Sequence, residues 1–446
     1  MAILRRLGAA VAMLIGLGTA GVTAAAAQTA PQIPVVFVHG NGDTAALWQP
    51  TIWRFESQGY DPKLLFAVDL AAPLARSVDD KPQPNRTSST DVAAQLAAEV
   101  ARVLITTGAQ KVALVGNSRG ANTIRNYVRF GGGAANTAIV VLGGGVNHGI
   151  FRDPNGANSE FNGAGALMTR LNTGGEVVPG VAFTTIRSDK NDKYAQPTGE
   201  FIGRPGQPTG ISYDAPALDG ATNLVLDGVD HREVAFSPQA FALIYEAIAG
   251  KKPQDTAIKP ETAPVLTGIV SGFAAGGPTN LPLAGATVTI YQVDPATGSR
   301  RGEARHTRTV GADGVWGPFT ADPTAYYEFE IAAPGYPTTH IYRTPFPRSA
   351  NYVTLRLQPV DEKLKQAKAA VTITRPRGYF GIDRDKIEIA GSLPDGINKG
   401  VPGTATATRL VDQPGQSVPV RFNDETLTIR AEGPADGHLA IAEFHY

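Results

Sequence analysis

The sequence predicts an α/β fold with a mostly parallel sheet, followed by one or two small β-sandwich-like domains of antiparallel strands. Between about residues 33 and 250, short apolar runs without polar alternation alternate with amphipathic helical stretches. Such runs are typical of strands that are covered on both faces, as in a parallel sheet. Beyond residue 263, apolar and polar residues alternate with a period of two, which indicates strands with one solvated face.

Length and charge limit the classes of protein that the chain can represent. The 446 residues suffice for two or three domains, because single cores stop growing at roughly 250–300 residues. Lys plus Arg and Asp plus Glu number 40 each, so no excess charge favours nucleic acid or an anionic membrane as partner. We expect a neutral partner and no nucleic acid. The chain has no cysteine, so its stability depends on packing and not on disulfides.

The first 27 residues are typical of a secretory signal peptide. Arg5 and Arg6 form a basic start, Leu7–Leu17 an apolar centre, and three alanines before Gln28 a small-residue cleavage site. The apolar centre is shorter than a membrane-spanning helix requires. We therefore expect cleavage near Ala27 and a secreted or periplasmic protein, with Sec and Tat export both open.

Residues 28–250 are predicted to form the α/β domain. The apolar runs predict six strands, at Pro34–Val38, Leu64–Leu70, Val112–Val115, Ala138–Leu142, Val181–Ile186 and Asn223–Leu226. Helices are expected between these strands. One begins near Thr90 or Asp91 and ends at Gly108, one covers Ala121–Phe130, and the last begins after Ser237 and ends at Gly250.

The remainder of the chain is predicted to be β-rich. Residues 251–263 are polar and contain proline, which is typical of a linker. Residues 264–360 are predicted to form a β-sandwich domain, and residues 361–446, which begin with a charged stretch, a second β-rich domain. The two parts are either separate domains or one compound domain.

A glycine-flanked serine lies between the third predicted strand and the following helix. In Gly116-Asn117-Ser118-Arg119-Gly120, two glycines stand two positions either side of Ser118. Small residues at these positions let strand and helix approach closely, while the serine takes a strained, positive φ. This geometry would hold the serine hydroxyl beside the first N–H groups of the helix, where negative charge is stabilised. Ser118 is the predicted nucleophile.

A serine nucleophile requires a base, and the base requires an orienting acid. The strand, G-x-S-x-G turn and helix resemble the nucleophile elbow of the α/β-hydrolases, in which serine, acid and histidine follow in this order. His231, after the last strand, is the predicted base, and His148 is expected to line the pocket or cap a turn. Asp189 and Asp192 both satisfy the order for the acid. Asp192 is favoured because it leaves three residues for the turn toward the histidine loop.

Two backbone N–H groups are expected to form an oxyanion hole. One belongs to Arg119, directly after the nucleophile, and the other to Asn41, in the loop after the first strand. His39 is expected to brace that loop. The Arg119 side chain is expected either to contact substrate or to reach solvent.

Residues 33–250 resemble the small secreted bacterial lipases of the class 2 type. The resemblance depends on these segments: Pro34-Val35-Val36-Phe37-Val38-His39-Gly40, Gln58-Gly59-Tyr60, Phe66-Ala67-Val68-Asp69, Gly108-Ala109-Gln110-Lys111-Val112, Ser118-Arg119-Gly120-Ala121-Asn122-Thr123, Leu142-Gly143-Gly144 and Gly228-Val229-Asp230-His231. It implies a hydrolase of carboxylic esters with Ser118, Asp192 and His231 as triad. It also implies Asn41 and Arg119 as oxyanion donors.

The chain departs from this family at the nucleophile. The family usually has histidine before the serine and methionine after it, where this chain has Asn117 and Arg119. This difference suggests a polar, charged rim and substrates that are less hydrophobic than long-chain fats. Residues 149–180 are expected to form either a cap over the pocket or a surface loop, with Phe151 as a pocket residue.

The sequence therefore predicts an exported serine lipase or esterase that acts on a neutral lipid or polyester through an acyl-serine intermediate. Two alternatives are a polyester depolymerase with the same triad and a non-catalytic protein that binds lipid, polymer or glycan. The β region resembles, in architecture alone, the lipid-facing β domain of some lipases, so contact with a lipid or polymer surface is expected there.

No cofactor and no metal are expected, because the chain has neither an H-E-x-x-H motif nor an acidic calcium loop. The absence of these two motifs does not exclude a structural ion that is bound by residues outside any recognised motif.

Overall fold

The structure is a computed structural model that describes residues 32–446. The predicted signal peptide lies outside the described residues. Within the described part of the chain, no helix is long and apolar enough to cross a membrane.

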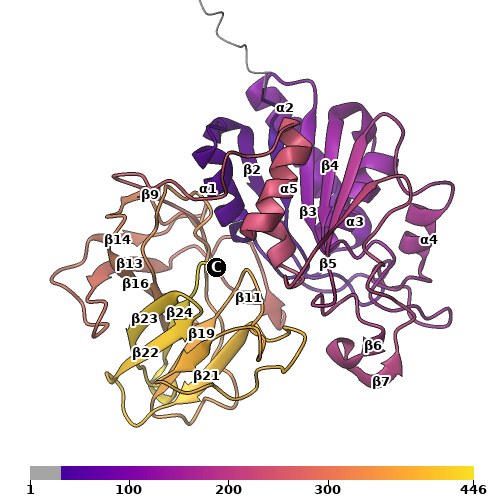
Figure 1. Ribbon diagram of the computed structural model, residues 1–446. Helices are drawn as coiled ribbons and strands as arrows, with labels where there is room; N and C mark the ends of the chain where they lie inside the picture. The colour runs from indigo at the N-terminus through magenta and orange to yellow at the C-terminus, as the bar shows by residue number, and fades with distance from the viewer. Residues whose placement is uncertain (1–31) are drawn as a thin grey trace, which may run out of the picture. The chain divides into compact units, whose positions relative to one another are not determined.

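A six-stranded parallel sheet forms the first part of the fold (Figure 1). The strand order is β2-β1-β3-β4-β5-β8, and every neighbouring pair is parallel. The strands are β1 (Val35–Val38), β2 (Leu65–Val68), β3 (Val112–Asn117), β4 (Thr137–Gly143), β5 (Ala182–Ser188) and β8 (Thr222–Leu226). All six predicted strands are present, and the predicted α/β fold is confirmed. A short hairpin of β6 (Thr198–Gly199) and β7 (Arg204–Pro208) lies between β5 and β8.

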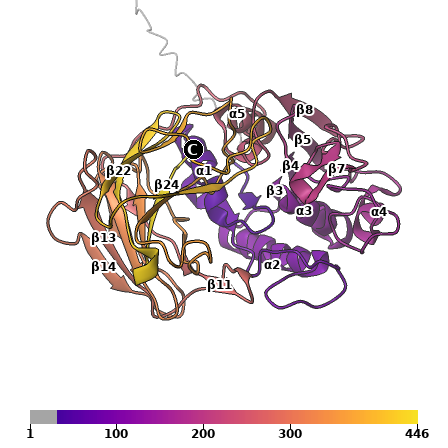
Figure 2. The same ribbon diagram turned by 90° about the horizontal axis from the view of Figure 1, so that it is seen from below.

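Helices cover both faces of this sheet (Figure 2). They are α1 (Gln49–Ser57), α2 (Ser89–Thr107), α3 (Arg119–Phe130) and α5 (Pro238–Ala249). The short helix α4 (Ala166–Asn172) packs against α3. Alternate residues of β1 face opposite sides, because successive side chains of a strand point to opposite faces. Val35 and Phe37 pack with α1 and α5, whereas Val36 and Val38 pack with α2 and α3.

Local sequence signals determine where these helices begin and end. The Ser88 hydroxyl accepts the N–H of Asp91, whose carboxylate accepts the N–H of Ser88, so a capping box begins α2 one or two residues earlier than predicted. Ser237 caps α5 in the predicted way, with Pro238 at the first helical position. Gly108 and Gly250 end their helices with φ of 70° and 67°, a left-handed conformation that glycine adopts without steric cost.

The C-terminal part is built around a seven-stranded sheet in the order β14-β13-β16-β17-β24-β19-β21. Its strands are β13 (Thr287–Val293), β14 (His306–Thr309), β16 (Tyr326–Ala332), β17 (Thr338–Arg343), β19 (Ala370–Thr374), β21 (Thr406–Leu410) and β24 (His438–Glu443). A three-stranded sheet consists of β20 (Ile387–Ile389), β22 (Ser417–Phe422) and β23 (Glu425–Arg430). Three short pairs complete this part: β9 (Val265–Leu266) with β15 (Phe319–Thr320), β10 (Val270–Ser271) with β18 (Leu355–Arg356), and β11 (Phe273–Ala274) with β12 (Gly277–Pro278).

The last strand corrects two details of the prediction. β24 pairs with both β17 and β19, and both pairings are parallel, where antiparallel strands were expected. The seven-stranded sheet therefore draws strands from both predicted β regions, and the boundary near residue 360 does not separate two sheets. Alternation identifies a strand and its buried face, but it carries no information about the strand's partner.

The predicted linker is fixed along α1. Arg54 Nε donates to the carbonyl of Thr256 at 2.9 Å, and the N–H of Lys259 donates to Ser57 Oγ at 2.9 Å. The fully buried Trp53 of α1 packs in the hydrophobic core of the β region. Residues 32–446 accordingly form one unit, in which the β region and the α/β domain share buried surface.

Candidate active site

Ser118 lies in the turn between β3 and α3 with φ of 56° and ψ of −121°. The two glycines are required by close contacts of the backbone. A Cβ at Gly120 would lie 2.3 Å from the Val38 carbonyl oxygen, and one at Gly116 would lie 2.9 Å from the Gly120 carbonyl oxygen. The strained serine conformation and the two close approaches are those of the predicted nucleophile elbow.

The His231 ring and the Asp192 carboxylate form a buried pair. His231 lies in the loop between β8 and α5, and its Nδ1 is 2.8 Å from Asp192 Oδ2. Asp192 follows β5, and its Oδ1 accepts the N–H of Tyr194 at 2.8 Å. Both side chains are at most 5 % exposed. An ionised carboxylate accepts the Nδ1–H, which leaves Nε2 with a lone pair available for a proton.

Nε2 of His231 is buried and has no hydrogen-bond partner among residues 32–446. It faces a small cavity that Ser118 also lines. Gly144 packs behind the ring, since a Cβ there would lie 3.3 Å from His231 Nδ1. The structure therefore brings the three predicted triad residues to one site, at the carboxyl ends of β3, β5 and β8.

Asp189 does not contact His231. Its carboxylate accepts the N–H of Asn191 at 3.2 Å and the Ser188 hydroxyl at 3.1 Å, so it stabilises a turn. Burial opposes ionisation, but hydrogen bonds from the backbone of Lys190 and Gly228 hold the pKa of Asp189 below its ordinary value. Asp189 therefore acts as a turn-forming residue.

The two predicted oxyanion donors lie on elements that meet at Ser118. A Cβ at Gly40 would lie 2.9 Å from Ser118 Cβ, so the loop after β1 passes directly beside the nucleophile. The N–H of Asn41 makes no hydrogen bond within residues 32–446, while its side-chain oxygen accepts the N–H of Ala75 at 2.7 Å. The N–H of Arg119, at the first position of α3, has no intrahelical acceptor.

His39 braces this loop, in agreement with the sequence expectation. Its Nδ1 donates to the Gly40 carbonyl at 2.8 Å, and its Nε2 accepts the N–H of Leu70 at 3.1 Å. Complete burial lowers the pKa of His39, so the ring is neutral at pH 7.

The Arg119 side chain corrects the prediction that it contacts substrate or reaches solvent. It is 0 % exposed and is paired with the equally buried Glu160, at 2.7 Å from Nε and 2.6 Å from Nη2. It also donates to the carbonyls of Pro73 and Thr87, at 3.1 and 2.8 Å. A buried guanidinium needs these acceptors, which lie far away in the sequence. Arg119 thus ties the segment around Glu160 to the elbow and forms no charged rim.

Asn117 replaces the usual histidine of the family and has a positioning role that the sequence did not indicate. Its Nδ2 donates to the carbonyl of Gly143 at 2.9 Å and to the carbonyl of His231 at 3.0 Å. The residue before the nucleophile therefore holds the backbone of the predicted base.

Two predicted pocket residues lie elsewhere. His148 Nδ1 is 2.7 Å from the Ala215 carbonyl, and its Nε2 is 2.7 Å from Glu176 Oε1, so it belongs to a separate contact. The Phe151 ring packs beneath the guanidinium of Arg204, at 5.0 Å. Neither lines the cavity. The cavity is lined by Asn41, Asp43, Ser118, Val146, Ile150, Phe161, Tyr194, His231, Arg232 and Tyr379. The sequence analysis identified residues 149–180 as a segment near the pocket. Because this segment has no periodic pattern, the sequence does not show which of its side chains face the cavity.

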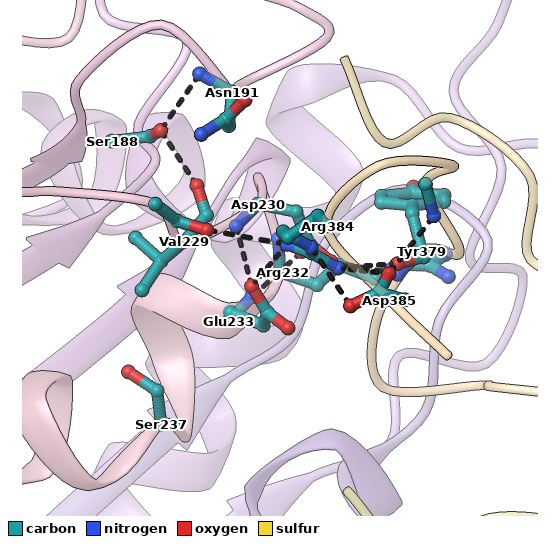
Figure 3. A network of polar contacts seen from close by, with 12 residues as sticks. Ser188, Asn191, Val229, Asp230, Arg232, Glu233, Ser237, Tyr379, Arg384 and Asp385 are labelled. Atoms are coloured by element: carbon teal, nitrogen blue, oxygen red, sulfur yellow. Dashed lines mark hydrogen bonds and ion pairs between the residues drawn. The ribbon is translucent and has the colours of Figure 1, made fainter. Parts of the chain in front are cut away.

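Residues of the C-terminal region reach the His231 loop through a network of buried charges (Figure 3). Asp230, which precedes His231, is 0 % exposed and lies 2.9 Å from Arg375 Nη1. Its carboxylate also accepts the N–H of Tyr379 at 2.7 Å. Arg384 is paired with Glu233 at 2.7 Å, and Arg375 is paired with the same carboxylate.

The charges of this network control the ionisation of Asp230. Burial opposes ionisation, but the attraction of Arg375 and Arg384 holds the pKa of Asp230 below its ordinary value. Tyr379 lies between this network and the cavity, where its ring packs against Arg232 at 4.8 Å. The sequence analysis assigned none of these C-terminal residues to the site, because nothing in the local sequence connects them to a histidine far earlier in the chain.

Lys193 joins the acid loop to the same region. Its Nζ donates to the Gly403 carbonyl at 2.9 Å and lies 3.8 Å from the centre of the Tyr379 ring. Burial, with a smaller contribution from Arg232, lowers the pKa of Lys193 to about 8. The loops of both Asp192 and His231 are therefore held by residues beyond position 370.

The parallel sheet, the elbow and the loops at its carboxyl edge define an α/β-hydrolase followed by a β-rich region. Comparison with known proteins extends this assignment. Residues 32–160 match the family described as lipase (class 2), and residues 266–360 match the lipase C-terminal domain. These two matches support a class 2 lipase with a C-terminal domain.

Solved structures show distant similarity. Lipase B of Aspergillus fumigatus is 16% identical, with a TM-score of 0.37, over 50% of this chain and 54% of that one, so the chain matches about half of that lipase. The mature Bacillus licheniformis lipase BlEst2 is 17% identical over 49% of this chain and 92% of that one, with a TM-score of 0.36. Phospholipase PlaB of Legionella pneumophila is 13% identical over 74% and 94%, with a TM-score of 0.36. The assignment above depends on the two family matches alone.

We expect Arg375→Gln to lower both stability and esterase activity. The substitution leaves the carboxylates of Asp230 and Glu233 without their shared guanidinium, and breaking a buried pair costs roughly 3–5 kcal/mol. Urea denaturation gives the free energy of unfolding, and nitrophenyl ester hydrolysis gives kcat. Arg301→Gln is the matched control, because Arg301 pairs with Asp294 at the surface and such pairs contribute about 0–1 kcal/mol. Equal losses in the two variants would contradict a special role for the buried network.

Lys193 should make stability depend on pH. Its pKa of about 8 lies below the ordinary value of 10.5, so between these pH values the unfolded chain binds more protons than the folded one. The free energy of unfolding therefore contains a contribution that rises with pH across this window, and the cost of the buried charge is greatest below pH 8. Urea denaturation of wild type and Lys193→Met on both sides of this window measures it. The variant should lack the rise, whereas Lys190→Met, at a neighbouring exposed lysine, should retain it.

Proposed function

We propose that the protein is an exported serine carboxylic ester hydrolase with Ser118 as nucleophile, His231 as base and Asp192 as acid. The observation that carries this proposal is the Asp192–His231 pair, whose free Nε2 faces the cavity that Ser118 lines. A buried imidazole nitrogen without a partner costs stability, and a catalytic role is one reason why a protein retains such a group. Export is supported by the composition of residues 1–27.

The reaction proceeds in two halves. Ser118 Oγ attacks the ester carbonyl carbon while His231 Nε2 takes the hydroxyl proton, and the Asp192 carboxylate stabilises the imidazolium. The N–H groups of Asn41 and Arg119 stabilise the oxyanion. The C–O bond then breaks, and the alcohol leaves with the proton from His231. Water, deprotonated by His231, releases the carboxylic acid from the acyl-serine in the second half.

The cavity favours esters of short acyl groups. Its volume is about 70 Å³, whereas pockets for drug-sized ligands span roughly 300–1,000 Å³. Val146, Ile150 and Phe161 supply apolar walls for an acyl group. Arg232 and Tyr379, which carry polar groups, also belong to the lining. Contact of the C-terminal region with a lipid or polymer surface stays a prediction.

Labelling with a fluorophosphonate tests the nucleophile. We expect one adduct, at Ser118, in the folded wild type and none in Ser118→Ala. An unlabelled wild type would support the alternative of a non-catalytic binding protein.

Asp192→Asn should lower kcat by roughly 10⁴-fold, because it destabilises the required tautomer of His231. Asp189→Asn is the matched control and should change kcat by less than about tenfold, since its carboxylate serves a turn. Equal losses would contradict the choice of acid.

The size of the cavity predicts selectivity for chain length. We expect kcat/KM for nitrophenyl acetate and butyrate to exceed that for the palmitate ester by at least about tenfold, because a long acyl chain does not fit the cavity. Measuring kcat/KM for a series of nitrophenyl esters from acetyl to palmitoyl tests this selectivity directly. Phe161→Ala should shift the preferred acyl chain length upward, because removing the ring enlarges the cavity. A palmitate preference in the wild type would contradict the short-chain proposal, and monomer release from a polyester film would favour the depolymerase.

A further inference from the structure

Two histidines and a glutamate meet on the seven-stranded sheet, outside the catalytic site. The ligand atoms of His340, His438 and Glu432 all lie within 4.8 Å of one another, and His340 Nε2 is 3.1 Å from His438 Nδ1. His340 is in β17 and His438 in the adjacent β24. Thr338 is the register partner of His438, so the two histidines are diagonal neighbours on one face of the sheet.

The other nitrogen of His340 is already occupied. Its Nδ1 donates to Glu328 Oε1 at 2.7 Å, and Glu328 is held in turn by Arg300 at 2.6 and 2.8 Å. This arrangement fixes the ring with its Nε2 lone pair toward His438 and Glu432. A carboxylate behind the far nitrogen of a histidine is the usual second layer of a metal site, where it orients the ring and raises its basicity.

The charges around the two rings favour a dication. Glu328, Glu330 and Glu432 supply three carboxylates, and Arg300, which pairs with the first two, supplies one positive charge. Two negative charges remain when both histidines are neutral. The Glu432 carboxylate makes no hydrogen bond or ion pair within residues 32–446. The Glu432 carboxylate oxygen and the two ring nitrogens thus lie within 4.8 Å of one another, and among residues 32–446 no lysine or arginine pairs with that carboxylate.

We propose that His340, His438 and Glu432 bind one divalent transition-metal ion of the Zn²⁺ type. Two imidazole nitrogens and one carboxylate oxygen are a ligand set that suits Zn²⁺, with a fourth position for water. The half-buried side chains of His438 and Glu432 leave a path for the ion. The ion would join β17, from the region that matches the lipase C-terminal domain, to β24, which lies outside that match.

Such an ion would act on stability and only indirectly on catalysis. β24 also pairs with β19, and Arg375 of the buried network directly follows β19. A bound ion fixes β24 beside β17 and thereby supports the strand from which Arg375 extends. Because the ion binds the folded chain preferentially, it raises the temperature of unfolding, and the rise continues with the logarithm of the free ion concentration above Kd.

Metal titration of the chelator-treated, full-length protein tests the proposal. We expect calorimetry to give one Zn²⁺ per chain and Co²⁺ to give the visible absorption of a histidine-bound ion. The unfolding temperature should rise with Zn²⁺ concentration and go on rising logarithmically above Kd. His438→Ala and Glu432→Gln should each weaken Zn²⁺ binding at least tenfold. Glu328→Gln, which changes only the group behind His340, should weaken it by roughly 10–100-fold.

Two controls localise the ion, and circular dichroism checks that each variant is folded. His306→Ala removes a histidine of β14 in the same sheet, and His231→Ala removes the histidine of the candidate active site. Both should bind Zn²⁺ as the wild type does. The proposal is overturned by a wild type that binds no stoichiometric Zn²⁺, in which case a proton alone bridges the two rings. It is also overturned if folded His438→Ala and Glu432→Gln retain wild-type affinity, or if His231→Ala abolishes binding.

Discussion

The structure depends most on the buried contact between the loop that carries His231 and the region beyond residue 370. Asp230 and Glu233 flank the histidine closely in sequence, and both accept from Arg375. The backbone N–H of Tyr379 also donates to Asp230, so the loop is fixed by directional bonds from a second part of the chain. An imidazole that must reach both an acid and a serine tolerates little rotation, since small displacements of catalytic groups cost large factors in rate.

Asp192, the proposed acid, is held by the same region. Lys193 follows Asp192 and reaches the Gly403 carbonyl and the Tyr379 ring, so one tyrosine contacts the loops of both the acid and the base. The N-terminal half of the site needs less external support, because the elbow is fixed by the sheet and by the close approach of Gly120 to Val38. The β region is accordingly a structural part of the site, whatever its role toward substrate.

Sequence reasoning reached the elements that obey local rules. The parallel strands follow from uninterrupted apolar runs and the elbow from its glycines. The pairing of Asp192 with His231 was predicted from the order of serine, acid and histidine along the chain and from the family resemblance. It was wrong for the side chain of Arg119, because a guanidinium at a motif position is assumed to be solvated unless its buried partner is known. Glu160 is that partner, and nothing in the sequence between the two residues connects them. Contacts between residues that lie far apart in the sequence could not be predicted for the same reason.

Charged residues hold the loop that carries His231, although apolar contacts would suffice for stability. The energetics of the buried network indicate why. Moving an ion from water into the interior costs several kcal/mol, so a buried pair is a weak source of stability and well-packed apolar residues often do better. Apolar contacts are non-directional, however, and they leave a loop free to slide. Asp230 Oδ2 accepts from both Arg375 Nη1 and the Tyr379 N–H, and these directional bonds restrict the orientation of the carboxylate. We infer that the chain accepts the desolvation cost because the network fixes the rotation of the residue that immediately follows, His231.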